Sequence, residues 1–138
     1  MSAEPLGRPS TGGATVKSEQ LTSVLICDDR ADTRRGLAQR VGQPEFFAAP
    51  VDIVGVTDGF ALLQALEAKP AAAVLIAIHA GSTVGNEAIT MLQGRHPEVA
   101  PIIVGSAADI DLLAEAYARG AGGLMLWEPD SSGLSSTG

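Results

Sequence analysis

Side chains that could do chemistry stand where four apolar runs of this sequence end. They are an acidic pair, a histidine, a serine and a tryptophan: Asp28 and Asp29, His79, Ser106 and Trp127. If the runs are parallel strands, their carboxyl ends meet at one edge of a sheet, which is where such sheets bind ligands. Two neighbouring carboxylates are ligands that could hold a divalent cation. The spacing therefore predicts an acidic pocket with an imidazole and a hydroxyl beside it.

Each of these side chains also has a simpler interpretation. Asp28 and Asp29 could be a solvated acidic pair that caps and orients the next loop. His79 could be a ligand or proton carrier, or an exposed loop residue beside the pocket. Ser106 could help to recognise an anion, or its hydroxyl could be satisfied by a neighbouring backbone group. Trp127 could line a small-molecule pocket with His79, or simply fill the pocket with apolar volume.

The elements that must position these residues alternate between strand and helix patterns. Continuous runs rich in Val, Leu and Ile predict strands buried on both faces, at residues 22–27, 51–56, 72–78, 101–105 and 124–127. A helical pattern follows each of the first four. Their expected N-caps include Asp32 and either Thr57 or Asp58, and their expected stops are Gly42 with Pro44, Pro70, and His96-Pro97. This alternation predicts a parallel sheet with helices on both faces, one of them incompletely covered because five strands have only four helices.

Composition limits the classes of function. The 138 residues are 46% hydrophobic and 18% charged, which suits one domain with a single core. A net charge of −7 argues against binding nucleic acid through the chain's own surface, because such binding needs a basic patch. Cys27 is the single cysteine and is interpreted as a small buried hydrophobe, so no internal disulfide is possible. With no signal peptide or membrane-length apolar run, we expect a cytoplasmic protein.

The two ends of the chain lack any periodic pattern. Residues 1–20 are rich in Pro, Gly, Ser and Thr and are expected to form a disordered tail. Residues 129–138 are rich in Ser and Gly and are expected to be a linker or a truncated C-terminal end. The predicted domain therefore runs over residues 21–128.

Six short motifs resemble, in order and spacing, those of response-regulator receiver domains of the NarL/LuxR type. They are VLICDD at 24–29, Thr33-Arg34-Arg35, VGVTDG at 54–59, Gly85 with Glu87 eight and ten residues after Ala77, IVGSA at 103–107 and GAGGL at 120–124. The resemblance covers about Ser23 to Glu128. It implies an α/β fold of the flavodoxin-like (βα)5 kind, with a doubly wound five-stranded parallel sheet in the order 2-1-3-4-5. The fifth helix of that fold is expected to be missing or frayed here.

The resemblance also implies a phosphorylation pocket, of which this chain keeps only a part. In the family two acidic residues help to hold Mg²⁺, and Asp28 and Asp29 stand at their places. A hydroxyl that binds the phosphoryl oxygens corresponds to Ser106. The aspartate that accepts the phosphoryl group in the family is replaced by Ala77. The lysine that pairs with the acidic residues, on the fifth strand, is replaced by Trp127.

The losses are chemically consistent with one another. A methyl group cannot form an acyl phosphate, so no catalytic residue remains at Ala77. Mg²⁺ loses an anionic oxygen ligand, and we expect its binding by Asp28 and Asp29 to be weak or absent, with no cofactor required. A lysine without that aspartate would be an unpaired buried charge, which Trp127 avoids. The aromatic ring that reports the state of the family's pocket is replaced by Leu124.

The sequence therefore predicts a phosphorylation-independent pseudo-receiver, not an enzyme, that acts as a dimerisation or regulatory module of a transcriptional regulator. Its partner would be a second copy or another regulator, and any DNA contact would belong to a C-terminal domain absent from this chain. Alternatives are a small-molecule site near Ala77, His79 and Trp127, a stand-alone interaction adaptor, or phosphoryl acceptance by another acid. Ser82 and Thr83 could accept phosphate from a kinase, an idea supported only by their expected exposure in a loop.

Overall fold

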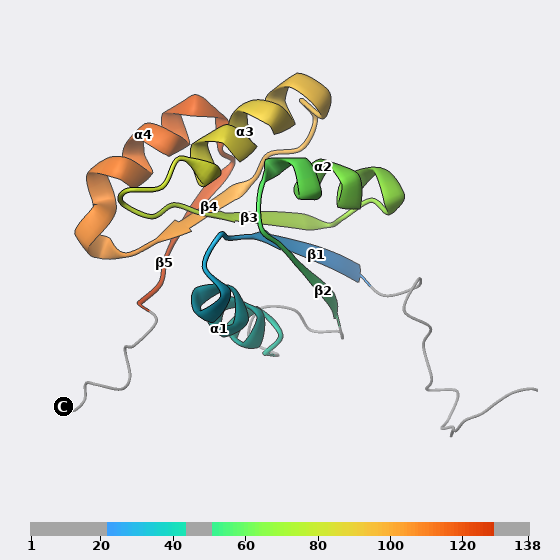
Figure 1. The fold of residues 1–138 in the computed structure, drawn as a ribbon, viewed down its shortest axis with the longest axis horizontal. Coiled ribbons are helices and arrows are strands. Elements are labelled where there is room, and N and C mark those ends of the chain that lie inside the picture. Colours follow the sequence, from blue (N-terminus) through green and yellow to red (C-terminus); the bar gives the residue numbers. More distant parts are fainter. Residues whose placement is uncertain (1–21, 44–50, 129–138) are drawn as a thin grey trace, which may run out of the picture.

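The chain forms one parallel β-sheet with helices packed on both faces (Figure 1). The structure is a computed structural model, and it describes residues 22–43 and 51–128. The predictions for the tail at 1–20 and for the linker at 129–138 lie outside the described residues. No helix in the described ranges is long and apolar enough to cross a membrane.

Strands and helices alternate as the sequence predicts. In chain order they are β1 (Thr22–Cys27), α1 (Ala31–Val41), β2 (Val51–Val56), α2 (Gly59–Ala68), β3 (Ala73–Ala77), α3 (Val84–Arg95), β4 (Ile102–Gly105), the short 3₁₀ helix η2 (Ala107–Asp109), α4 (Ile110–Gly120) and β5 (Gly123–Leu126). The strand order is β2-β1-β3-β4-β5 and every pairing is parallel. Both the fold class and the predicted strand order are confirmed.

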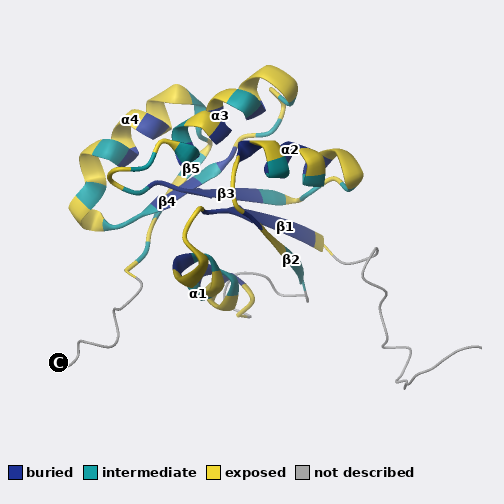
Figure 2. Ribbon diagram, viewed as in Figure 1, coloured by how far each residue is buried: buried dark blue, intermediate teal, exposed yellow. Residues whose placement is uncertain are grey.

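The sheet is covered unequally on its two faces. Helix α1 packs on one face, and α2, α3 and α4 pack on the other (Figure 1). The central strands β1 and β3 are buried, whereas the edge strand β5 is only half-buried or exposed (Figure 2). Apolar side chains on both faces of the central strands explain why their sequences are continuous rather than alternating. No α-helix follows β5 within the described residues, so a fifth helix would have to lie beyond Glu128.

Strand register brings the predicted site residues to one edge. Cys27 at the end of β1 pairs with Ile76 of β3, and Ala77 pairs with Val104 of β4. The residues that follow β1, β3 and β4 therefore emerge side by side at the carboxyl edge of the sheet. This edge is the place where the sequence predicts the acidic pocket.

The predicted helix caps were partly right. Asp58 caps α2, because its Oδ1 accepts a hydrogen bond of 2.8 Å from the backbone N–H of Ala61. The prediction that Asp32 caps α1 is wrong. Arg30 is at the N-cap position without a side-chain bond, and Asp32 lies in the first turn of the helix. Helix α1 begins before Asp32 because Asp28 accepts the backbone N–H of Arg30, which bends the chain directly after β1.

Candidate functional site

The Asp28 carboxylate is the buried centre of the site. Only 1% of the residue is exposed. Its Oδ1 lies 3.0 Å from the backbone nitrogen of Arg30 and 2.8 Å from Nε2 of His79, and its Oδ2 accepts a 2.5 Å bond from Oγ1 of Thr33. Buried carboxylates need such partners because they have lost their water. The interpretation of Asp28 as half of a solvated pair is therefore wrong, because Thr33 and His79 enclose it.

Asp29 has a different environment from Asp28. Its side chain is exposed, and its Oδ2 accepts a 2.8 Å hydrogen bond from Oγ of Ser82. Ser82 belongs to the loop between β3 and α3, which also carries His79. The two carboxylates thus hold this loop at two points, which places the Ser82 hydroxyl in a hydrogen bond rather than free in a flexible loop.

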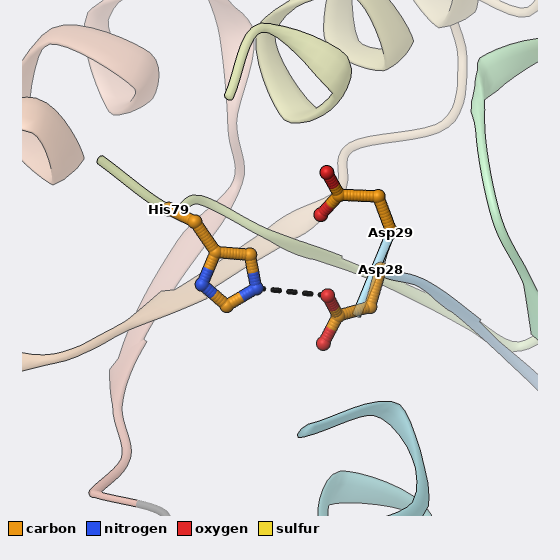
Figure 3. A group of neighbouring side chains, drawn as sticks. All are labelled: Asp28, Asp29 and His79. Atoms are coloured by element: carbon orange, nitrogen blue, oxygen red, sulfur yellow. Dashed lines mark hydrogen bonds and ion pairs between the residues drawn. The ribbon is translucent and has the colours of Figure 1, made fainter. Parts of the chain in front are cut away.

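His79 turns its ring toward the acidic pair (Figure 3). Its side chain is only 15% exposed, so the interpretation as an exposed loop residue is wrong. Ligand atoms of Asp28, Asp29 and His79 all lie within 4.8 Å of one another. A carboxylate accepts hydrogen bonds, so the tautomer of His79 that makes this bond to Asp28 carries its proton on Nε2.

Ala77 lies beside a small cavity at the same edge. The residue is 6% exposed, at the carboxyl end of β3. The cavity has a volume of about 130 Å³, and its walls include Asp28, His79, Ser106 and Trp127. The residues predicted to form the pocket are thus brought together, apart from Asp29, which is not among the cavity walls.

Trp127 forms one wall of the cavity instead of filling it. The residue follows β5 and donates its backbone N–H to the carbonyl oxygen of Gly105 over 2.8 Å. Its ring packs against α1 at Gly36, where a Cβ atom would come within 2.7 Å of Cη2 of the ring. The prediction that Trp127 fills the pocket is corrected, because this close approach to α1 holds the ring to one side.

Replacing Gly36 by alanine is expected to displace the Trp127 ring, because the added methyl group overlaps Cη2. Trp127 is the single tryptophan, so its emission should shift to longer wavelengths as water reaches the ring. Gly94→Ala is the control, since a Cβ there meets nothing within 4 Å. Identical emission spectra for Gly36→Ala and the unaltered protein would contradict this placement of the ring.

Ser106 is engaged by a carboxylate that the sequence did not single out. Its Oγ lies 3.1 Å from Oε1 and 3.2 Å from Oε2 of Glu128, and Oε2 also accepts the backbone N–H of Ala107 over 2.8 Å. The Ser106 hydroxyl itself accepts the backbone N–H of Ala108. Glu128 therefore fastens the end of β5 to the turn after β4. Its position immediately beyond the last strand, at the edge that carries Ser106, was the available signal.

Structures with the same fold have been solved, although sequence comparison alone finds none. No protein-family model matches the chain, and no curated protein sequence matches it. NtrX from Brucella abortus is 20% identical with a TM-score of 0.63 over 86% of this chain. The receiver domain of NtrX from the same organism is 20% identical with a TM-score of 0.57, covering 83% of this chain and 94% of that domain. The N-terminal signal receiver domain of a response regulator from Bacteroides fragilis is 17% identical with a TM-score of 0.61, covering 82% of this chain and 91% of that one.

The chain has the receiver-domain fold. It spans 26% of the NtrX chain, so the likeness extends to the receiver part and not to the rest of that protein. At identities of 17–20% the comparison shows a shared fold, and the chemistry must be argued from the pocket itself.

The residues of this receiver-like pocket do not fit the Mg²⁺ ion that the resemblance implies. Magnesium prefers a near-octahedral set of oxygen ligands. Both oxygens of Asp28 already accept hydrogen bonds, one oxygen of Asp29 is bound by Ser82, and Ala77 offers no side-chain oxygen. Weak binding of Mg²⁺ by Asp28 and Asp29 stays a prediction.

Cys27, next to the site, has no chemical role there. Burial raises the pKa of its thiol from 9.0 to about 12, helped by the negative charges of Asp58 and Asp28. The thiol therefore stays protonated and unreactive near neutral pH. This supports the interpretation of Cys27 as a small buried hydrophobe.

Proposed function

We propose that this chain is a regulatory receiver-like module that works by protein contact and is not switched by aspartyl phosphorylation. The observation that carries the proposal is the Ala77 methyl group at the carboxyl end of β3, in the wall of the cavity that Asp28 and Ser106 share. A phosphoryl group needs an oxygen nucleophile at that place, and the chain supplies none. The protein is accordingly a binding module and not an enzyme.

The experiment is incubation of the chain with acetyl phosphate and Mg²⁺, followed by intact mass spectrometry. We expect no phosphoryl adduct, whereas a receiver domain that keeps its aspartate is the positive control. Asp28 in the cavity wall and Asp29 next to it are held by hydrogen-bond donors and are poorly placed to attack. Asp109 also lines the cavity, so the absence of an adduct tests this carboxylate as well. A stoichiometric, acid-labile adduct would overturn the proposal.

The surface of α4 and β5 supports a protein partner, either a second copy or another regulator. Four large apolar side chains are exposed on these two neighbouring elements: Ile110, Tyr117, Leu124 and Leu126. Apolar groups gathered in this way mark contact surfaces. Concentration-dependent sedimentation tests for self-association, and a monomer at all concentrations would leave another regulator as the partner.

The protein that carries this module is proposed to be a cytoplasmic transcriptional regulator of the NarL/LuxR type. The support is the sequence resemblance, in particular at VGVTDG. DNA binding would be done by a domain outside this chain, since a net charge of −7 is unsuited to it.

A second candidate function is control by a small molecule bound in the cavity beside Ala77. The apolar ring of Trp127 in the cavity wall favours this function, and the volume of about 130 Å³ limits the ligand to a very small molecule. Titration with candidate metabolites, followed by the emission of Trp127, tests it. Saturable quenching would support a ligand, and unchanged emission would favour contact with proteins alone.

A further inference from the structure

The loop between β3 and α3 is tied to the end of β1 by the chain's own side chains. His79 bonds to Asp28 at one point, and Ser82 bonds to Asp29 three residues later (Figure 3 shows the His79 contact). Both ties are made to the acidic pair that would otherwise attract a cation. The loop therefore has protein partners at the same carboxylates where a metal-dependent pocket would need an ion.

Asp28 accepts hydrogen bonds from three donors in this arrangement. The backbone N–H of Arg30, the Thr33 hydroxyl and Nε2 of His79 all approach it, at 3.0, 2.5 and 2.8 Å. The first two are local, from within five residues of Asp28 along the chain, and they shape the turn into α1. The third donor, His79, is 51 residues away along the chain, and its bond joins the end of β1 to the loop that follows β3.

We infer that His79 is the built-in substitute for a divalent cation at Asp28. Its N–H satisfies the buried carboxylate and holds the β3–α3 loop against β1 without any ion. The imidazole acts toward Asp28 as a hydrogen-bond donor, because the proton on Nε2 occupies the lone pair that this nitrogen would offer a metal, and only Nδ1 keeps a free lone pair. The inference concerns how Asp28 is satisfied, and it goes beyond the proposed function because it does not depend on the partner.

Mg²⁺ affinity distinguishes competition by His79 from the absence of a carboxylate at Ala77. If the missing carboxylate at Ala77 were the sole obstacle, Ala77→Asp would restore Mg²⁺ binding. If His79 also competes for Asp28, the ion must displace a charge-assisted hydrogen bond before it can bind. Removal of His79 should then strengthen Mg²⁺ binding by about tenfold or more, as expected for a hydrogen bond to a charged group.

The test compares Mg²⁺ titrations of Ala77→Asp and of Ala77→Asp/His79→Ala, followed by the emission of Trp127 in the wall of the same cavity. We expect the double variant to bind Mg²⁺ at least about tenfold more tightly. Ser82→Ala in the Ala77→Asp background is the matched control, because it removes the other tie of the same loop and leaves His79 on Asp28. It should leave the Mg²⁺ affinity of Ala77→Asp within about threefold, since the Ser82 hydroxyl bonds to the exposed Asp29 and to the backbone of Val84 but not to Asp28.

A second measurement keeps Ala77 and changes at most one residue, so it does not require the double variant to fold. The thermal midpoint of the unaltered protein should not respond to millimolar Mg²⁺, whereas that of His79→Ala should rise with Mg²⁺ because the ion then binds the folded state. Equal Mg²⁺ affinity in Ala77→Asp and in the double variant would overturn the inference. So would stoichiometric Zn²⁺ binding by the unaltered protein that His79→Ala abolishes, because His79 would then be a ligand. Neither result would revive aspartyl phosphorylation, which the acetyl phosphate experiment tests separately.

Discussion

Asp28→Ala is expected to lower the free energy of unfolding by about 3 kcal/mol, because it leaves several buried donors without an acceptor. Only 1% of the residue is exposed, and its carboxylate accepts hydrogen bonds from Arg30, Thr33 and His79. Truncation would break the turn into α1 and detach the β3–α3 loop in one step. In a pocket with three clustered carboxylates, loss of one can relieve repulsion, but here Ala77 leaves Asp28 with only Asp29 as an acidic neighbour in the pair.

Asp29→Ala is the matched control, one residue away and with the same change of charge. Its side chain is exposed and makes one hydrogen bond, to Ser82, so we expect a loss below about 1 kcal/mol. Urea unfolding monitored by circular dichroism measures both variants. Equal effects of the two substitutions would mean that Asp28 is no more than an acidic surface residue.

Most of the fold could be predicted from the sequence because its signals are local. Each buried strand is a continuous run of Val, Leu and Ile, and each helix has an apolar stripe and an end signal, so the β-α alternation is plain. Strand ends were misplaced by about one residue, as for β3, predicted at 72–78 and observed at Ala73–Ala77. The cap of α1 was missed because it depends on Asp28, which bends the chain before Asp32 is reached.

The site was predicted as a place but not as a set of contacts. Parallel strands bring Asp28, Ala77 and Ser106 to the same edge whatever the loops do, so their proximity followed from the strand pattern. The bonds of His79 and Glu128 depend on the path of a loop and of the chain after β5, which no local pattern encodes. The contacts of both residues were therefore missed from the sequence, although each residue lies within two residues of the end of a strand.

Gly85→Ala is expected to destabilise the fold by about 2 to 3 kcal/mol, the usual cost of overpacking a tight contact. A Cβ at Gly85 would lie 2.6 Å from the carbonyl oxygen of Ala77 and 2.6 Å from Cδ1 of Ile78. The carbonyl belongs to the central strand β3 and cannot swing away as the end of a side chain could. Helix α3 would have to move off the sheet at the point where β3 enters the site.

Gly94→Ala, in the same helix, tests the opposite sign with the same chemical change. A Cβ there meets nothing within 4 Å, so alanine should stabilise α3 by its helix propensity, by up to about 1 kcal/mol. The free energy of unfolding, measured with a chemical denaturant, should therefore fall for Gly85→Ala and rise for Gly94→Ala relative to the unaltered protein. If Gly85→Ala proved neutral or stabilising, α3 would not be seated on β3 as closely as the structure places it. The space between the Ala77 carbonyl oxygen and Gly85 would then be large enough for a methyl group, contrary to the 2.6 Å approach in the structure.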